Sequence, residues 1–145
     1  MGSKPIYHQA TSSPLGTYEG RKLVLSVAEE SGVLYTRYQL LDAEGFAVVS
    51  ASDAAQALDL FSAWSPDLVV LNYELDHVTG DVVAEAMKKH MPRVPIIMVV
   101  KSVELVGRCS RYADAFVAAN DSPNKLLRLI QKSIADGPAQ QREQT

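Results

Sequence analysis

The sequence predicts an α/β fold, a doubly wound parallel sheet of five strands with five helices packed on its two faces. The first observation is order: five short apolar runs alternate with five segments of helical character, as in repeated β-α-β units. The second is composition: the third and fourth runs, residues 67–71 and 95–100, are apolar without alternation, as in strands covered on both faces. We expect right-handed crossovers.

Five strands are predicted from these runs. Their ranges and sequences are 22–27 (KLVLSV), 46–51 (FAVVSA), 67–71 (DLVVL), 95–100 (PIIMVV) and 114–119 (DAFVAA). In a sheet of this kind, ligands gather at the carboxyl ends of the strands. We therefore expect functional residues where each run ends.

The first predicted helix, residues 29–45, has apolar side chains at helical spacing and ends on Gly45, a residue typical of the position after a helix. Its apolar positions are Val33, Leu34, Tyr38 and Leu41. The second, residues 52–64, begins with a capping Ser52 or Asp53 and ends at a Ser-Pro pair, because the residue before proline avoids helical backbone. Its inward positions are Ala54, Ala57, Leu58 and Phe61.

The third predicted helix starts at Asp81 and carries cations in its last turn, where they suit the helix dipole. The fourth, residues 103–112, is short and interrupted by Gly107. The fifth, residues 122–135, has Pro123 at its first position, where the missing N–H costs nothing. Its inward positions are Leu126, Leu127, Ile130 and Ile134.

Length and composition indicate one soluble globular domain. The chain has 145 residues, of which 47% are hydrophobic and 21% charged, with a formal net charge of −3. That charge gives no field favouring nucleic acid or an anionic membrane, and no run reaches the ~18 apolar residues of a membrane span. The single cysteine, Cys109, excludes an internal disulfide framework and fits a reducing compartment, so we expect a cytoplasmic protein.

We expect three parts along the chain. Residues 1–21, rich in Gly, Ser, Thr and Pro, predict a flexible N-terminal arm. Residues 22–135 hold all predicted strands and helices. Residues 136–145 begin with a helix-stopping Gly-Pro pair and predict a polar C-terminal tail.

The segment EGFAVVSASDAAQALDLFSAWSPDLVVLN, residues 44–72, and the fivefold β/α order resemble the receiver domain of two-component response regulators. The resemblance covers residues 22–135. It implies a CheY-like, flavodoxin-like sheet with strand order 2-1-3-4-5. It also implies phosphorelay signalling, in which a histidine kinase gives its phosphoryl group to an aspartate at the end of the third strand.

The chemistry of that reaction sets what each position must supply. The acceptor must be an ionised aspartate, because a carboxylate oxygen attacks phosphorus. A magnesium ion needs hard oxygen ligands, which receivers take from acids after the first strand, from the acceptor and from a nearby carbonyl. A hydroxyl after the fourth strand and a lysine after the fifth bind the phosphoryl oxygens.

This chain departs from that pattern at each role. The acceptor falls on Asn72, whose amide carries no negative charge and is a poor nucleophile. The acidic pair falls on Ala28 and Glu29, the hydroxyl on Val100 and the lysine on Ala119. We therefore predict a degenerate phosphoacceptor site, or pseudo-receiver, with no catalytic residue.

Two weaker interpretations stay open beside it. Glu29, Asn72 and the carbonyl of Glu74 could bind a cation weakly, although Glu29 and Glu30 are better explained as first-turn acids of a helix, since a single firm carboxylate makes a weak magnesium site. Lys101 could pair with Glu29 or Glu74, or be a solvated loop lysine. We expect no true metal site and no cofactor.

A basic face is predicted over the fourth helix, fifth strand and fifth helix, where receivers dimerise or meet effectors. Its residues are Arg108, Arg111, Lys125, Arg128 and Lys132. The alternative is the ordinary solvent side of an amphipathic helix.

The sequence thus predicts a stand-alone, atypical receiver that acts by phosphorylation-independent protein–protein interaction and is not an enzyme. Its partner would be a histidine kinase or a signalling effector, or a second copy in a homodimer, with no nucleic acid and no membrane. The alternative is a receiver fold switched by a cation or small ligand in the crevice at the strand ends. No P-loop, GxGxxG, CxxC or HExxH motif is present.

Overall fold

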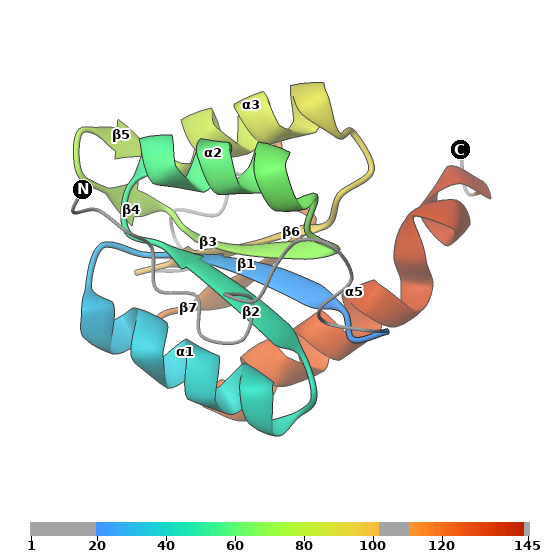
Figure 1. Ribbon diagram of the computed structural model, residues 1–145, viewed down its shortest axis with the longest axis horizontal. Helices are drawn as coiled ribbons and strands as arrows, with labels where there is room; N and C mark the ends of the chain where they lie inside the picture. The colour runs from blue at the N-terminus through green and yellow to red at the C-terminus, as the bar shows by residue number, and fades with distance from the viewer. Residues whose placement is uncertain (1–19, 102–110, 144–145) are drawn as a thin grey trace.

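The computed structural model describes residues 20–101 and 111–143, with side chains as far as residue 136. A parallel sheet of five strands, in the order β2-β1-β3-β6-β7, runs through its centre (Figure 1). The strands are β1 (Leu23–Val27), β2 (Ala47–Ala51), β3 (Leu68–Asn72), β6 (Ile96–Val100) and β7 (Ala115–Ala118). Since β6 and β7 are the fourth and fifth predicted strands, the predicted order 2-1-3-4-5 is confirmed.

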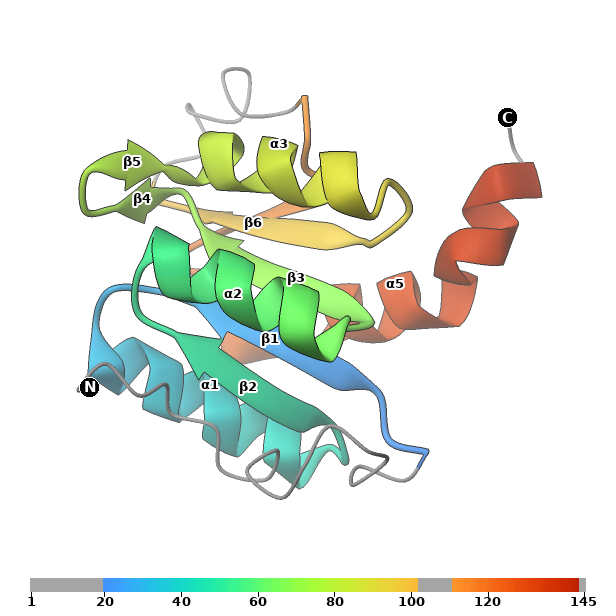
Figure 2. The ribbon, with the colours of Figure 1, turned by 45° about the horizontal axis from the view of Figure 1, so that its top comes forward.

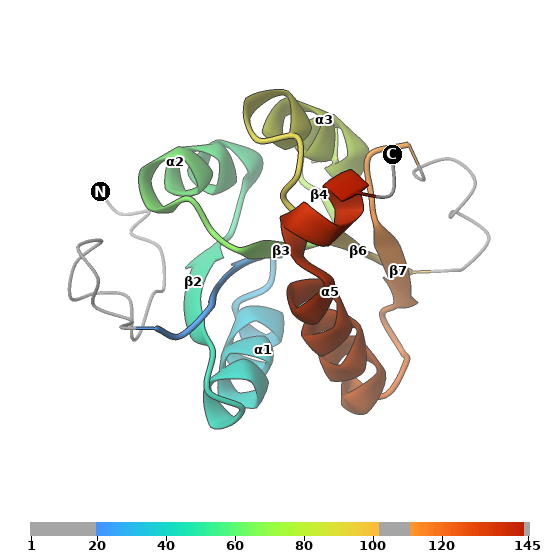
Figure 3. The same ribbon diagram turned by 90° about the vertical axis from the view of Figure 1, so that its right-hand side faces the viewer.

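Among the described residues, four helices cover the two faces of the sheet. They are α1 (Ser31–Ala43), α2 (Ala54–Trp64), α3 (Gly80–His90) and α5 (Pro123–Glu143). Figure 3 shows α2 and α3 on one face and α1 and α5 on the other. The remaining predicted helix, residues 103–112, lies almost wholly outside the described residues. Within the described part of the chain, no helix is long and apolar enough to cross a membrane.

The helix boundaries follow the local signals in the sequence. Asp53 caps α2, since its side chain accepts a hydrogen bond from the backbone N–H of Gln56 at 2.8 Å. Ser65 ends α2 in the left-handed conformation, with φ of 48°. Helix α3 begins at Gly80, one residue before the predicted Asp81, and its last turn carries the predicted cations.

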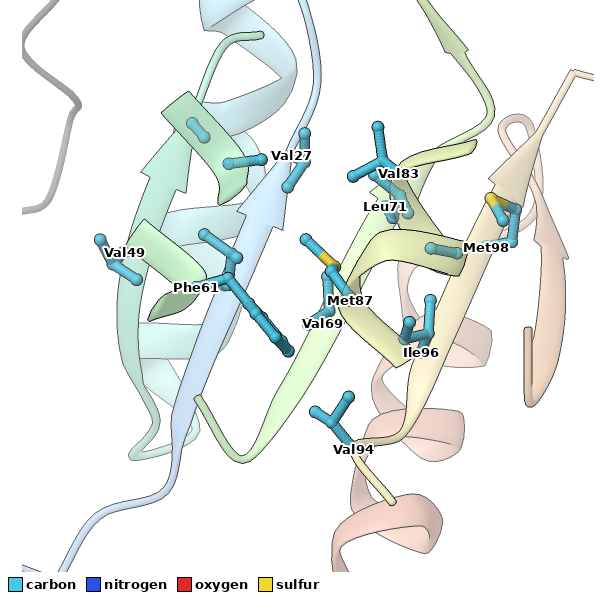
Figure 4. Close-up of a cluster of buried hydrophobic side chains, with 14 of the residues drawn as sticks. Val27, Val49, Phe61, Val69, Leu71, Val83, Met87, Val94, Ile96 and Met98 are labelled. Carbon is cyan, nitrogen blue, oxygen red and sulfur yellow. The ribbon is translucent and has the colours of Figure 1, made fainter. Parts of the chain in front are cut away.

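The core has one layer on each face of the sheet. Figure 4 shows the layer beneath α2 and α3, where Phe61 and Met87 meet Val69 and Leu71 of β3. The opposite layer, beneath α1 and α5, contains the residues of the same strands whose side chains point to the other face of the sheet. Buried residues of α1 and α5 complete it. Its members include Leu41, Leu68, Val70, Ile97, Leu126, Leu127 and Ile130. Because helices cover both faces, β3 is apolar without alternation until Asn72.

Two features were not predicted. A two-stranded hairpin, β4 (Glu74–Leu75) and β5 (Val78–Thr79), follows β3, and His77 at its turn has a φ of 71°. Helix α5 was predicted to end before Gly137-Pro138 but continues to Glu143. Figure 2 shows its last turns changing direction. A proline inside a helix removes one hydrogen bond and bends the helix, and here it does not end it.

Candidate functional site

The centre of the site is Asn72, the last residue of β3. Its backbone is fixed by the sheet, where Asn72 lies beside Val99 of β6 and the N–H of Tyr73 donates to the carbonyl of Val99 at 2.8 Å. Strand alternation places its side chain on the same face as Leu68 and Val70, which is the face covered by α1 and α5. Asn72 is half-buried there.

The side chain that meets Asn72 is Arg37, which projects from α1 toward the sheet. Arg37 is 7% exposed. One terminal nitrogen, Nη1, donates to Ser26 Oγ and to the carbonyl of Val27, each at 3.4 Å. The other, Nη2, donates to Oδ1 of Asn72. The guanidinium therefore connects α1 to the carboxyl ends of β1 and β3.

Arg37 is a buried cation whose contacts are all neutral. Burial lowers the pKa of its guanidinium to about 10, so the group stays protonated at neutral pH. Its acceptors are a hydroxyl, a carbonyl and an amide oxygen. None of the ion pairs among the described residues involves Arg37. Its positive charge therefore has no direct counter-charge among residues 20–101 and 111–136.

The contact with Arg37 also fixes the orientation of the Asn72 amide. A guanidinium has only donors, so it must face Oδ1 and not Nδ2. Oδ1 is the one side-chain atom of Asn72 that could ligate a cation. In this arrangement Oδ1 of Asn72 already accepts a hydrogen bond from the positively charged guanidinium of Arg37.

The other predicted positions surround a cavity of about 270 Å³ at the strand ends. Glu29, Asn72, Val100 and Ala119 all line it. Ala28 is fully buried behind them, so the structure does not bring it to the cavity wall. The N–H of Ala119 donates to the carbonyl of Val100 at 2.7 Å, which holds the last two positions side by side.

Acidic residues form the outer rim of this cavity. A hydrogen bond between the side chains of Glu29 and Asp76, followed by desolvation and by repulsion from Asp76, Glu30 and Glu74, raises the pKa of Glu29. Lys101 pairs with Glu74 at 3.0 Å, one of the two partners considered for it. Among the described residues, no group of three His, Cys, Asp or Glu is placed to hold a metal ion.

A second cavity, of about 470 Å³, lies between α1 and the start of α5. Arg37 and Asn72 line it together with apolar residues such as Leu40 and Leu126. Its acidic residues are Glu30 and Asp121. Asn72 therefore forms part of the wall of both cavities.

The profile of the response regulator receiver domain matches residues 24–132. This chain belongs to the response regulator receiver domain family. Receiver domains are signalling modules of two-component systems and not enzymes.

Curated relatives of this receiver domain include transcriptional regulators. The "Probable transcriptional regulator ycf27" of Guillardia theta is 32% identical over 114 residues, which are 74% of this chain and 43% of the relative. The "Transcriptional regulatory protein CreB" of Escherichia coli is 27% identical over 128 residues, 81% of this chain and 56% of the relative. The chain spans about half the length of these relatives, and the stand-alone receiver stays a prediction.

Solved receiver structures share the fold. A CheY-like receiver domain protein from Methanospirillum hungatei JF-1 has a TM-score of 0.76 at 26% identity, covering 86% of this chain and 99% of that one. TrrA from Thermotoga maritima, solved in complex with Mg(2+)-BeF, has a TM-score of 0.74 at 25% identity, covering 77% and 98%.

The predicted basic face of the receiver is only partly formed by free cations. Lys125 pairs with Asp121 at 3.2 Å, and Lys132 pairs with Asp136 at 3.7 Å. The guanidinium of the exposed Arg111 lies 5.5 Å from the ring centre of Tyr112, and Arg128 is exposed. Arg108 lies outside the described residues, as does Cys109.

Sequence reasoning missed Arg37. This residue lies three positions after Leu34 and four before Leu41. Both of these leucines are buried, so the same helical spacing points Arg37 at the sheet. An arginine at such a position was the available signal.

Proposed function

We propose that this receiver domain signals through protein contacts without being phosphorylated. The observation that carries the proposal is the side chain at the end of β3. Asn72 offers an amide in place of a carboxylate, and the oxygen of that amide already accepts a hydrogen bond from Arg37. An amide has no anionic oxygen with which to attack phosphorus.

The surroundings of Asn72 support the same function. A phosphoryl group in the 270 Å³ cavity would meet the methyl groups of Val100 and Ala119, which donate no hydrogen bonds. It would also face the carboxylates of Glu29 and Glu74 on the rim. The cavity therefore presents carboxylates that repel a phosphoryl group, and the lysine that lines it, Lys101, already pairs with Glu74 at 3.0 Å.

The proposed partners are a histidine kinase, a signalling effector or a second copy of the chain, each binding through a protein surface. The candidate surface is the face of β7 and α5, where Arg111 and Arg128 are exposed. We expect no nucleic acid to bind this domain directly, because its net charge is −3 and its lysines on α5 are paired with acids.

The cation-switched alternative has less support. It needs an oxygen of Asn72 as a ligand, and that oxygen faces a guanidinium. It also needs Glu29 as the one firm carboxylate, whereas magnesium gives up its waters only to concentrated negative charge.

The test is phosphorylation with acetyl phosphate and magnesium, read by intact mass. The wild-type chain should gain no phosphoryl group. The matched control restores Asp at positions 28, 29 and 72, Thr at 100 and Lys at 119, and should gain measurably more than Asn72→Asp alone. A phosphoryl group on the wild-type chain, mapped to Asn72 or its neighbours, would refute the proposal.

A second measurement needs no covalent chemistry. Magnesium with beryllium fluoride, the complex named for the Thermotoga protein, should leave the thermal midpoint of the wild-type chain unchanged. A reproducible rise in the midpoint with both components, absent with either alone, would contradict the proposal.

A further inference from the structure

The burial of Arg37 is not explained by the proposed loss of phosphorylation. A buried charge is costly unless it is paired, and Arg37 is 7% exposed with only neutral acceptors. The acids that line the same cavity do not bond to it: Asp121 pairs with Lys125, and Glu30 is exposed. A leucine would fill this position on the helix without that cost.

We propose that Arg37 is the built-in counter-ion of this receiver's site, holding beside residue 72 the positive charge that other receivers take from a bound cation. The inference rests on the proposed function and adds the residue that enforces it. In this proposal Arg37 is a positioning residue. Its guanidinium keeps Oδ1 of Asn72 turned toward α1 and keeps external cations away from that oxygen.

The geometry supports this role in two ways. Ser26 and the carbonyl of Val27 anchor Nη1, so the guanidinium cannot move away from β3 without losing both bonds. Nη2 then lies within hydrogen-bonding distance of Oδ1, the one side-chain atom of Asn72 that could bind a cation. A cation at that oxygen would lie against a like charge in a partly desolvated site.

The deciding experiment uses Asn72→Asp, which changes the charge at position 72 and hardly its shape. If Arg37 is the counter-ion, the new carboxylate completes a buried ion pair, and the thermal midpoint at neutral pH should rise on the order of 5 °C. Without a cation there, a new carboxylate near Glu29 and Glu74 would be repelled and the midpoint would fall. A midpoint that falls, or does not change, overturns the proposal.

The matched comparison repeats Asn72→Asp in the Arg37→Met and Arg128→Met backgrounds. Arg128 is exposed on α5, so its removal should leave the rise intact, whereas Arg37→Met should turn the rise into a fall. An equal effect in both backgrounds overturns the proposal. If Arg37→Met does not fold, Arg37→Lys replaces it. A lysine lacks the second terminal nitrogen and should give a smaller rise.

A second arm tests the exclusion of cations. Ala28→Asp with Asn72→Asp restores two carboxylates, and millimolar magnesium should raise the midpoint of this variant more when Arg37→Met is also present. An equal magnesium effect with and without Arg37, or no effect in either chain, overturns the exclusion. Phosphorylation of the wild-type chain would instead refute the proposed function, so the two failures are distinguishable.

Discussion

Gly80→Ala should destabilise the domain through a collision under the site. Gly80 begins α3 directly after the β4–β5 hairpin, and its N–H donates to the carbonyl of Tyr73 at 2.6 Å. A Cβ at this position would lie 2.6 Å from the carbonyl oxygen of Asn72, 2.9 Å from Cα of Tyr73 and 2.9 Å from Sδ of Met98. Two of these three atoms are backbone of the segment that ends β3, so they cannot give way cheaply.

The magnitude follows from the overpacking. Forcing a methyl group into a filled site costs about 1–3 kcal/mol, and we expect the upper half of that range because backbone must move. For a domain of this size, a loss of about 2 kcal/mol lowers the thermal midpoint by roughly 8 °C. Calorimetry or urea unfolding followed by circular dichroism measures the change.

Gly32→Ala is the matched control. Gly32 lies in the first turn of α1, and no heavy atom lies within 4 Å of the Cβ it would gain. Alanine there should leave stability unchanged or raise it by up to about 1 kcal/mol, because glycine loses more backbone entropy on folding. If the two substitutions have equal effects, the close packing of Gly80 against β3 does not constrain the fold as described.

Two further predictions concern charged groups. The pKa of Glu29 is raised, chiefly by its hydrogen bond with Asp76, so the ionised carboxylate opposes folding. The protonated carboxyl stabilises the folded state below the ordinary pKa of glutamate, and this stabilisation is lost as pH rises through the raised pKa. Glu29→Gln should therefore raise the thermal midpoint at pH 7, and an advantage that persisted below pH about 4 would contradict this cause. Asp114 accepts from the N–H of Ile96 at 2.8 Å and from Nζ of Lys88 at 2.7 Å. Asp114→Ala should cost about 1–2 kcal/mol in urea unfolding, and an unchanged midpoint would show that these bonds add nothing.

The sequence predicted the fold well because its local signals agree with one another. Apolar runs without alternation gave the covered strands, and the periodic positions Leu34, Leu41 and Phe61 are all buried as predicted. Asp53 caps its helix as its position indicated. The same local reasoning was wrong about Gly137-Pro138, where one lost hydrogen bond bends α5 without ending it.

The sequence alone carries the prediction of what the site lacks. The resemblance to receiver domains assigns Asn72, Ala28, Val100 and Ala119 to positions where phosphoryl transfer needs other chemistry, and this assignment stays a prediction. Composition and spacing carry such information because each residue type has fixed donors, acceptors and charge.

Only the tertiary structure showed that a buried arginine, Arg37, contacts Asn72 at this site. Arg37 lies 35 positions from Asn72 along the chain, and although its spacing from Leu34 and Leu41 directs it inward, nothing in the sequence shows that it meets Asn72. Its contact arises because α1 packs across β1 and directs one of its inward positions to the end of β3. Whether a charge is solvated or buried against an amide is set by the packing of distant elements, and that packing makes Arg37 the cation of this site.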